Sequence, residues 1–340
     1  MSAAARARAL ADVGRLEQAE AAVRTGLTET PADAELLGLL AGLQRLQGHY
    51  PGALVSAEAA VAAAPDMAVL HIEYAECLLL VSRLDDALAA AHEAARLRPD
   101  APEPHRSVAR CLMSRRDLAG AREAAGRAVG IAPNSVPDLM ALAEAEHLAG
   151  NRDAARAAAA RALAEDPGDA DGRWMMALLD AERMRVRDAM RGLRGLAADQ
   201  PDRYGAPALT WPIRGLLAGL RRGLLAGVPF TAFLAVIGQW WPPAELLGRG
   251  AAVVMVFVTV GLAVRVLIPA GRLPWICLGL LPARRRRAVV AGLITAVTFL
   301  PFLSWYAAGA RWQALAGSFA ALIVLLAAGV AEGTNGDLPD

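Results

Sequence analysis

The chain of 340 residues contains no lysine, so all 35 of its basic residues are arginine. A phosphate-binding loop of the Walker type needs a lysine, and the sequence therefore excludes that kind of nucleotide site. Carboxylates are scarce in the C-terminal part, where residues 205–340 hold 4 acidic and 11 basic residues, against 30 and 24 in residues 1–204. The net charge of +1 thus conceals an acidic half and a basic, apolar half.

Cysteine and histidine are also scarce, with three and five residues. Cys77, Cys111 and Cys277 do not show the spacing of a disulfide framework or a zinc site. No HExxH pair, nucleophile elbow or dinucleotide-binding glycine motif is present. We therefore expect no enzymatic activity, no bound metal and no cofactor. Nucleic acid is not an expected partner, because its phosphates require a basic face and residues 1–204 are net acidic.

Proline recurs every 34 residues along the first 204, at Pro31, Pro65, Pro99, Pro133, Pro167 and Pro201. Alanine keeps the same period at two phases, namely Ala7, Ala41, Ala75, Ala109, Ala143, Ala177 and Ala19, Ala53, Ala87, Ala121, Ala155, Ala189. Small residues are needed where two helices cross closely, and a proline after the second helix stops it. The period predicts a series of helix–turn–helix units.

These residues resemble the tetratricopeptide repeat (TPR) family over about residues 1–204. The predicted turn between the two helices of each unit reads Gly14, Gly48, Ser82, Arg116, Gly150 and Met184. The sixth unit is degenerate, because Leu196 stands where the other units have glycine or alanine. His71 and His105 replace a large aromatic that the family often carries. The resemblance implies a right-handed α-solenoid of about six repeats whose concave wall binds peptides or helices of other proteins.

The resemblance also implies which phases of each repeat line that wall. The groove predicted from the third to sixth repeats comprises Ile72, Glu76, Leu79, Arg106, Arg110, Met113, Met140, Glu144, His147, Trp174 and Leu178. Arg106 and Arg110 lie four residues apart on one helix face, so we expect them to meet one carboxylate of a peptide or an amphipathic helix together. The alternative for some of this set is packing between neighbouring repeats.

Four segments beyond residue 204 are apolar and long enough to cross a bilayer, and they span about 223–241, 250–269, 288–309 and 313–331. We expect residues 205–222 to form a capping or juxtamembrane helix and residues 332–340 a short acidic tail. The predicted fold class is therefore all-α, a TPR-like solenoid followed by a four-helix transmembrane domain.

Arginine is the main charged residue of this region. Arg265 is the one ionisable residue inside a predicted span, and its long side chain can reach the nearer membrane surface. The absence of intramembrane carboxylates argues against ion-coupled transport. A run of four arginines is expected to contact lipid headgroups, unless it serves only to set the topology; it comprises Arg284, Arg285, Arg286 and Arg287.

Glycines recur every four residues ahead of and within the first predicted span, at Gly215, Gly219, Gly223 and Gly227. Such a stripe lets helix backbones approach closely. It predicts either self-association of the protein or packing within one chain.

The sequence predicts a membrane-anchored scaffold that recruits a partner protein to the inner membrane of a bacterium, with the solenoid in the cytoplasm. The alternative function is a small channel, a lipid-handling unit or an export-complex subunit, with the solenoid as its regulatory domain.

The topology follows from the distribution of arginine, since cytoplasmic loops carry the excess of positive charge. Reporter fusions after Gly248, Pro282 and Asp340 should read outside, inside and inside. An outside reading after Pro282 would contradict the predicted topology.

Overall fold

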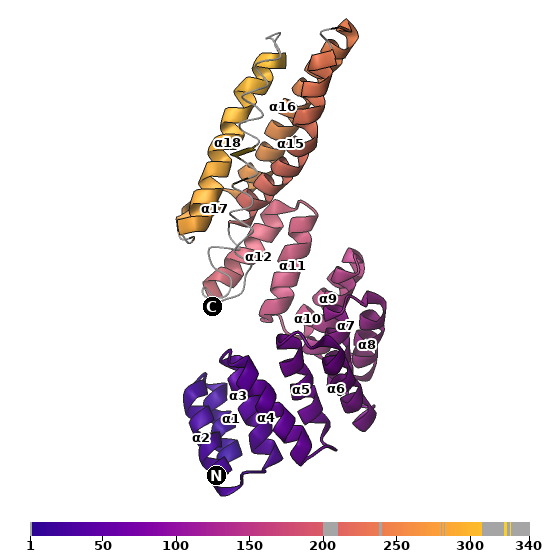
Figure 1. Ribbon diagram of the computed structural model, residues 1–340, viewed down its shortest axis with the longest axis vertical. Coiled ribbons are helices and arrows are strands. Elements are labelled where there is room, and N and C mark those ends of the chain that lie inside the picture. The colour runs from indigo at the N-terminus through magenta and orange to yellow at the C-terminus, as the bar shows by residue number, and fades with distance from the viewer. Residues whose placement is uncertain are drawn as a thin grey trace. The chain divides into compact units, whose positions relative to one another are not determined.

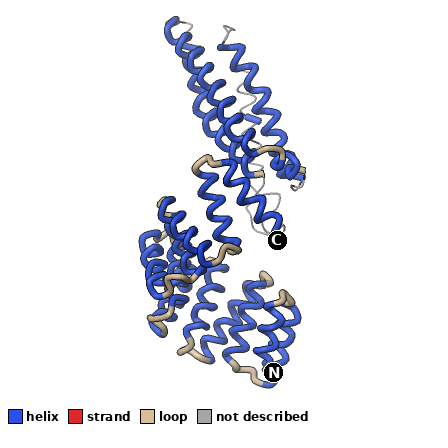
Figure 2. The backbone as a smooth tube through the Cα atoms, turned by 180° about the vertical axis from the view of Figure 1, so that it is seen from behind, coloured by secondary structure: helices blue, strands red, loops and turns tan. Residues whose placement is uncertain are grey.

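The computed structural model describes residues 2–199, 210–237, 240–279, 281, 283–307, 323–324 and 327. Within these ranges the chain forms helices joined by loops and contains no strand, as Figure 2 shows. Two compact units are present, Met1–Met176 and Ala177–Asp340. Their boundary falls inside α11 (Ala170–Glu182), earlier than the limit of the solenoid predicted at residue 204.

The first unit is a row of antiparallel helical hairpins, which Figure 1 shows from α1 to α10. Each hairpin packs its two helices together and then packs against the next hairpin. The helices are α1 (Ala3–Asp12), α2 (Leu16–Glu29), α3 (Ala34–Leu46), α4 (Tyr50–Ala63), α5 (Ala68–Leu80), α6 (Leu84–Leu97), α7 (Pro102–Ser114), α8 (Leu118–Ile131), α9 (Val136–Leu148) and α10 (Arg152–Glu165).

The twelve periodic alanines are buried, with exposed fractions from 0% to 3%. They occupy the interior of the hairpins, as the period predicts, because only a small side chain fits where two helix backbones cross closely. Leu78 and Leu139, both 0% exposed, fill the wider spaces in the core. The burial of small residues at fixed phases makes successive hairpins alike.

Each turn between paired helices contains one residue with a positive φ angle. These residues are Gly14 (74°), Gly48 (81°), Ser82 (60°), Arg116 (64°), Gly150 (84°) and Met184 (57°). The structure confirms the predicted turn position in all six units. Three of the turns place a residue with a Cβ in the left-handed region, which costs about 1–2 kcal/mol relative to the right-handed region.

The starts of several helices follow from local hydrogen bonds. Asp33 accepts a bond from the backbone N–H of Leu36 at 3.1 Å and so caps α3. The two histidines at the usual aromatic position form a contact of another kind. Nε2 of His71 lies 2.8 Å from the carbonyl oxygen of Pro65, and Nε2 of His105 lies 2.8 Å from that of Pro99. Each histidine thus joins its helix to the proline that ends the preceding repeat.

The second unit contains a bundle of long helices. Its elements are α12 (Val186–Asp199), α15 (Trp211–Ile237), α16 (Pro242–Ala270), α17 (Leu273–Leu278) and α18 (Ala283–Ala307). α15 and α16 run antiparallel and pack against α18, while α12 packs against α16. The core of the bundle is apolar and is formed by Ile213, Leu216, Leu217, Leu220, Val228, Ala235, Ala252, Val266, Val289, Leu303 and Tyr306.

One helix replaces two predicted elements in this unit. α15 continues through residue 222, where the capping helix was predicted to end and the first span to begin. No proline interrupts the junction, and even Pro229 is accommodated inside α15. The fourth predicted span, 313–331, lies outside the described residues except for residues 323, 324 and 327. The predicted tail, 332–340, lies wholly outside them.

Within the described residues, one helix is long and apolar enough to cross a membrane, namely Pro242–Ala270. The most apolar 18 residues of this helix have a mean hydropathy of 2.6, and only 17% of these residues are buried. A shorter apolar stretch, Gly227–Ile237, forms the last part of α15.

The turn geometry predicts opposite effects of glycine substitutions. Arg116→Gly should raise the free energy of unfolding by about 0.5–1 kcal/mol, because it relieves left-handed strain and loses part of that gain to the flexibility of the unfolded chain. Gly150→Ala should lower it by about 1 kcal/mol. Denaturant unfolding of the full chain, followed by far-ultraviolet circular dichroism, measures both.

Ala149→Gly is the matched control, because Ala149 precedes Gly150 in the same turn and has a φ of −73°. It should destabilise the protein. A stabilising effect of Ala149→Gly equal to that of Arg116→Gly would show that the φ angle is not the cause.

Candidate functional site

The odd-numbered helices form the inner wall of the first unit. α1 contacts α3, α3 contacts α5, α5 contacts α7 and α7 contacts α9, and these contacts are more extensive than those between successive even-numbered helices. A row of hairpins packed more tightly along one side must curve toward that side. The odd-numbered helices therefore line the concave wall in the described repeats.

A groove of about 420 Å³ lies on this wall over the first three repeats. Its lining residues come from α1, α3 and α5 with the residue that precedes α5, and they are Arg8, Ala11, Glu35, Gly38, Leu39, Gly42, Leu43, Leu46, Met67, Val69, Leu70, Ile72 and Glu73. Leu46 and Val69 are 61% and 59% exposed, although both are large apolar side chains. We define these residues as the N-terminal groove, which is the candidate functional site.

Two glycines of α3 line the N-terminal groove, and one of them, Gly42, leaves open space in it. A Cβ atom at Gly38 would lie 2.6 Å from Cδ2 of Leu70, so Leu70 fills the place of that side chain. A Cβ atom at Gly42 would have the Glu73 carboxylate at 3.7 Å as its nearest neighbour, an ordinary contact distance. Gly42 is therefore a position where a larger side chain would occupy the groove without displacing the backbone.

Each charged residue of the N-terminal groove has an oppositely charged partner. Arg8 binds Glu35 across α1 and α3. Arg45 donates two hydrogen bonds to Glu73 across α3 and α5, at 2.6 and 3.1 Å. The hydrogen bond to Glu73 raises the pKa of Arg45 above its usual value. Each guanidinium thus has a carboxylate beside it, and the groove presents an apolar floor with compensated charge at its rim.

The predicted arginine pair is also engaged by carboxylates of this chain. Arg106 Nη1 lies 2.5 Å from Oδ1 of Asp138 on α9, and Asp138 is 0% exposed. Arg110 Nη2 lies 2.7 Å from Oε2 of Glu76 on α5. α7 is therefore joined to the helix on each side by one ion pair. A ligand carboxylate would have to compete with Glu76 or Asp138, and the joint clamp stays a prediction.

The other predicted groove residues lie in three kinds of environment. Ile72 lines the N-terminal groove. Leu79 and Met113 pack in or against the core cluster that joins α5 to α8, and Met140 packs against the cluster of α8, α9 and α10. Glu144 is exposed, and the remaining residues, His147, Trp174 and Leu178, are half-buried. Leu178 lies beyond the boundary between the two units.

The groove predicted from the sequence lies in the third to sixth repeats and does not include the first two, although the repeat phases also indicate the N-terminal groove. The phases predicted to face the concave wall give Glu35, Gly38, Gly42, Arg45 and Leu46 in the second repeat, and four of these line the groove. The same phases give Arg8 and Ala11 in the first repeat and Val69 and Ile72 in the third, which all line it. The two glycines, which lack a side chain, did not suggest a binding surface by themselves.

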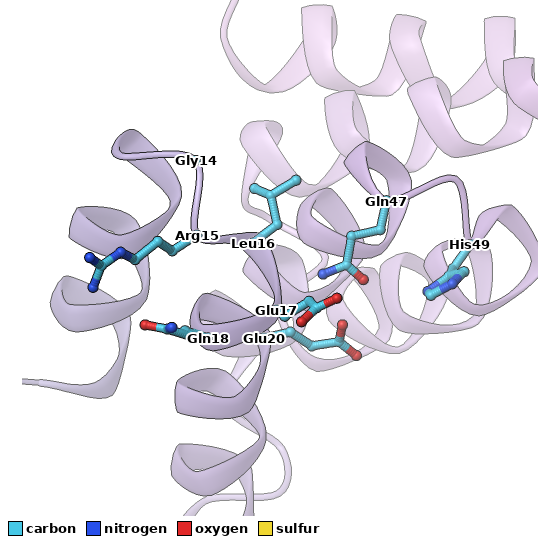
Figure 3. Close-up of a pocket in the computed structure, with 8 residues that line it drawn as sticks. All are labelled: Gly14, Arg15, Leu16, Glu17, Gln18, Glu20, Gln47 and His49. Atoms are coloured by element: carbon cyan, nitrogen blue, oxygen red, sulfur yellow. The ribbon is translucent and has the colours of Figure 1, made fainter. Parts of the chain in front are cut away.

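A second, polar depression of about 610 Å³ lies at the turns of the first two hairpins. Figure 3 shows Glu17, Glu20 and Gln47 extending into the same space, while Arg15 and Gln18 lie on the other side of α2. Among the described residues, no group of three or more histidine, cysteine or acidic residues could hold a metal ion. Polar side chains that can form hydrogen bonds line this depression, whereas large apolar side chains line the N-terminal groove.

Glu76, which pairs with Arg110 between α5 and α7, should make the stability of the protein depend on pH. Burial raises the pKa of Glu76 above 4.5, although Arg110 beside it acts in the opposite direction. A raised pKa in the folded state means that the folded protein binds the proton more tightly, so stability falls as the pH rises above about 4.5 through this pKa. Glu76→Gln removes that loss. As the pH rises above about 4.5, the free energy of unfolding of Glu76→Gln should therefore increase relative to that of the wild type.

Urea unfolding at a series of pH values measures this difference. Glu144→Gln, at the same repeat phase but exposed, controls for the loss of one negative charge. Parallel curves for the wild type and Glu76→Gln would contradict the assignment.

Comparisons with known proteins agree with this architecture. No protein-family model matches the sequence, and no curated protein matches it. The solved structure of PilW, a type IV pilus biogenesis factor, is 18% identical with a TM-score of 0.51, covering 59% of this chain and 93% of that chain. The Cut9–Hcn1 hetero-tetramer of the APC/C is 14% identical with a TM-score of 0.53, covering 59% and 40%.

A thermophilic TPR protein from Thermus thermophilus is 24% identical with a TM-score of 0.49, covering 52% of this chain and 96% of that chain. The 34-residue helical hairpins, their buried alanines and the concave wall of odd-numbered helices are the features of one known architecture. The N-terminal part of the chain has the tetratricopeptide-repeat fold.

Proposed function

We propose that this protein is a membrane-anchored scaffold, and that its N-terminal groove binds an apolar segment of a partner protein. The observation that carries the proposal is the groove itself, in which large apolar side chains are exposed beside the open position at Gly42. Exposed apolar surface in a concave site is typical of a protein-binding surface. No catalytic role is part of the proposal.

The groove specifies the chemistry of the partner. Leu46, Val69 and Ile72 offer dispersion contacts and apolar area, while the ion pairs Arg8–Glu35 and Arg45–Glu73 leave no charge uncompensated at the rim. A charged segment would lose its hydration here without gaining a partner charge. An uncharged helix or extended peptide with two or three apolar side chains on one face fits best.

The C-terminal unit supplies the membrane anchor in this proposal. Its helices bury one apolar face in the bundle and carry a second apolar face on the outside. Examples on α16 are Val254, Phe257 and Ile268, which are 60%, 73% and 67% exposed. A water-soluble bundle has polar residues on its outer face, whereas lipid favours this arrangement. The proposal extends to four spans through the apolar segments 223–241, 288–309 and 313–331.

The ends of the bundle support the proposed orientation. A Cβ atom at Gly248 would lie 2.9 Å from the hydroxyl of Tyr306, so the end of α18 lies beside the first half of α16. Trp240, Trp241 and Trp305 belong to that end and are 78%, 56% and 63% exposed. Tryptophan favours membrane interfaces, and the arginine-rich end opposite would be cytoplasmic. We propose the inner membrane as the location and the cytoplasm for both termini and the solenoid.

A steric block of the groove tests the binding function. Gly42→Leu should fill the groove and weaken partner binding at least tenfold, while leucine in place of glycine favours helix formation in α3. The full chain in mild detergent is used to capture partner proteins, and a peptide covering the bound segment is then titrated against each variant.

Gly126→Leu on the even-numbered helix α8 is the matched control, because that glycine is exposed and has open space around it. Its affinity should equal that of the wild type. Equal affinity of Gly42→Leu would exclude the N-terminal groove as the binding surface. Binding that requires the spans and not the solenoid would favour the channel, lipid-handling or export-subunit alternative.

A further inference from the structure

The arginines that follow Arg249 in the C-terminal unit lack acidic neighbours in the sequence. Between Glu245 and Glu332 the chain contains no aspartate and no glutamate. Arg249 pairs with Glu245 at 2.6 Å, but the arginines after it have no carboxylate in the sequence before Glu332. Arg272, Arg286 and Arg287 are exposed in the structure. The side chains of Arg284 and Arg285 lie outside the described part.

These arginines flank the short helix α17. Pro274 and Cys277 of α17 are buried, as is Leu281 just after it, whereas Trp275 and Ile276 are 44% and 67% exposed. α17 therefore rests one face on the bundle, where it contacts α15, and turns an aromatic and an aliphatic side chain outward.

One hydrogen bond ties the start of α18 to the end of α17. Nη1 of Arg286 donates to the carbonyl oxygen of Gly279 at 3.2 Å. Arg272 immediately precedes α17 on its other side. The corner thus carries an outward apolar pair between two arginine positions. We define the α17 corner as Arg272, Trp275, Ile276, Arg286 and Arg287.

We propose that the α17 corner binds the phosphate of an anionic phospholipid. This inference rests on the proposed membrane anchor. Trp275 and Ile276 would enter the interfacial layer, where an indole ring is favoured, and the guanidiniums would meet the lipid phosphate. The exposed apolar face of α16, which ends near Ile268, leads directly to this corner and would place it at the surface of the bilayer.

Charge identifies anionic lipid as the occupant. A zwitterionic headgroup brings its own positive charge to the surface, whereas the α17 corner already holds three guanidiniums and the local sequence supplies no carboxylate. Each basic residue near an anionic leaflet favours binding, and the effect weakens with added salt. Arg286 can bind a phosphate with the donors that its hydrogen bond to Gly279 leaves over.

The test compares lipid retention by the full chain in mild detergent. Phosphatidylglycerol and phosphatidylcholine are titrated separately, and bound lipid is counted by native mass spectrometry. The double variant Arg286→Gln/Arg287→Gln should lose phosphatidylglycerol affinity about 25-fold, or about fivefold for each arginine. Trp275→Ala should weaken the binding of both lipids. Wild-type binding of phosphatidylglycerol should fall with salt.

Arg249→Gln removes one arginine charge at the other end of α16 and should bind lipid as the wild type does. The double variant keeps Arg272, Arg284 and Arg285, so a reporter after Pro282 should still read inside. Equal phosphatidylglycerol affinity of the double variant and Arg249→Gln would overturn the inference and leave the arginines a role in topology alone. If glycerophosphate displaced phosphatidylglycerol completely, the acyl chains would not contribute to binding, and the ligand would be a free phosphate and not a lipid. A reporter after Pro282 that reads outside in the wild type would instead contradict the proposed anchor.

Discussion

The close crossing of paired helices at buried alanine is the constraint on which the solenoid depends. Twelve alanines at two phases are 0–3% exposed, so each hairpin brings its helix backbones together at the same points. Because side-chain size sets the distance between packed helices, equal small residues give equal hairpins. Equal hairpins stack with the same displacement at each step, which is why the odd-numbered helices collect on one wall. The groove is open at Gly42, where that wall carries no side chain.

Ion pairs join the stacked helices along this wall. Asp138 is fully buried against Arg106, and Glu76 is nearly buried against Arg110. Removing one member of such a pair leaves an uncompensated buried charge, which is far more costly than losing an exposed pair. These arginines therefore stabilise the order of the repeats, and a partner carboxylate at Arg110 would exchange one ion pair for another. Apolar contact in the N-terminal groove involves no such exchange.

Much of the fold could be predicted from the sequence, because the alanines, the turn residues and the concave phases all follow the 34-residue period. The ion pairs could not, since the separation along the chain varies with the stacking geometry: it is 28 residues for Arg45–Glu73 and 32 for Arg106–Asp138. The junction at residue 222 was also beyond the sequence pattern. Glycines recur there every four residues, a spacing that marks a helix face and gives no signal for its ends.

The proposed function gives a physical reason for joining a small groove to an anchor. A groove of about 420 Å³ accommodates only a few side chains, and affinity from so little contact is limited. A partner that is itself confined to the membrane would meet the groove at a high effective concentration, so weak contacts would suffice for occupancy. The same partner in solution would bind poorly. Anchoring would then determine where the scaffold acts, while the apolar groove determines which segment it accepts.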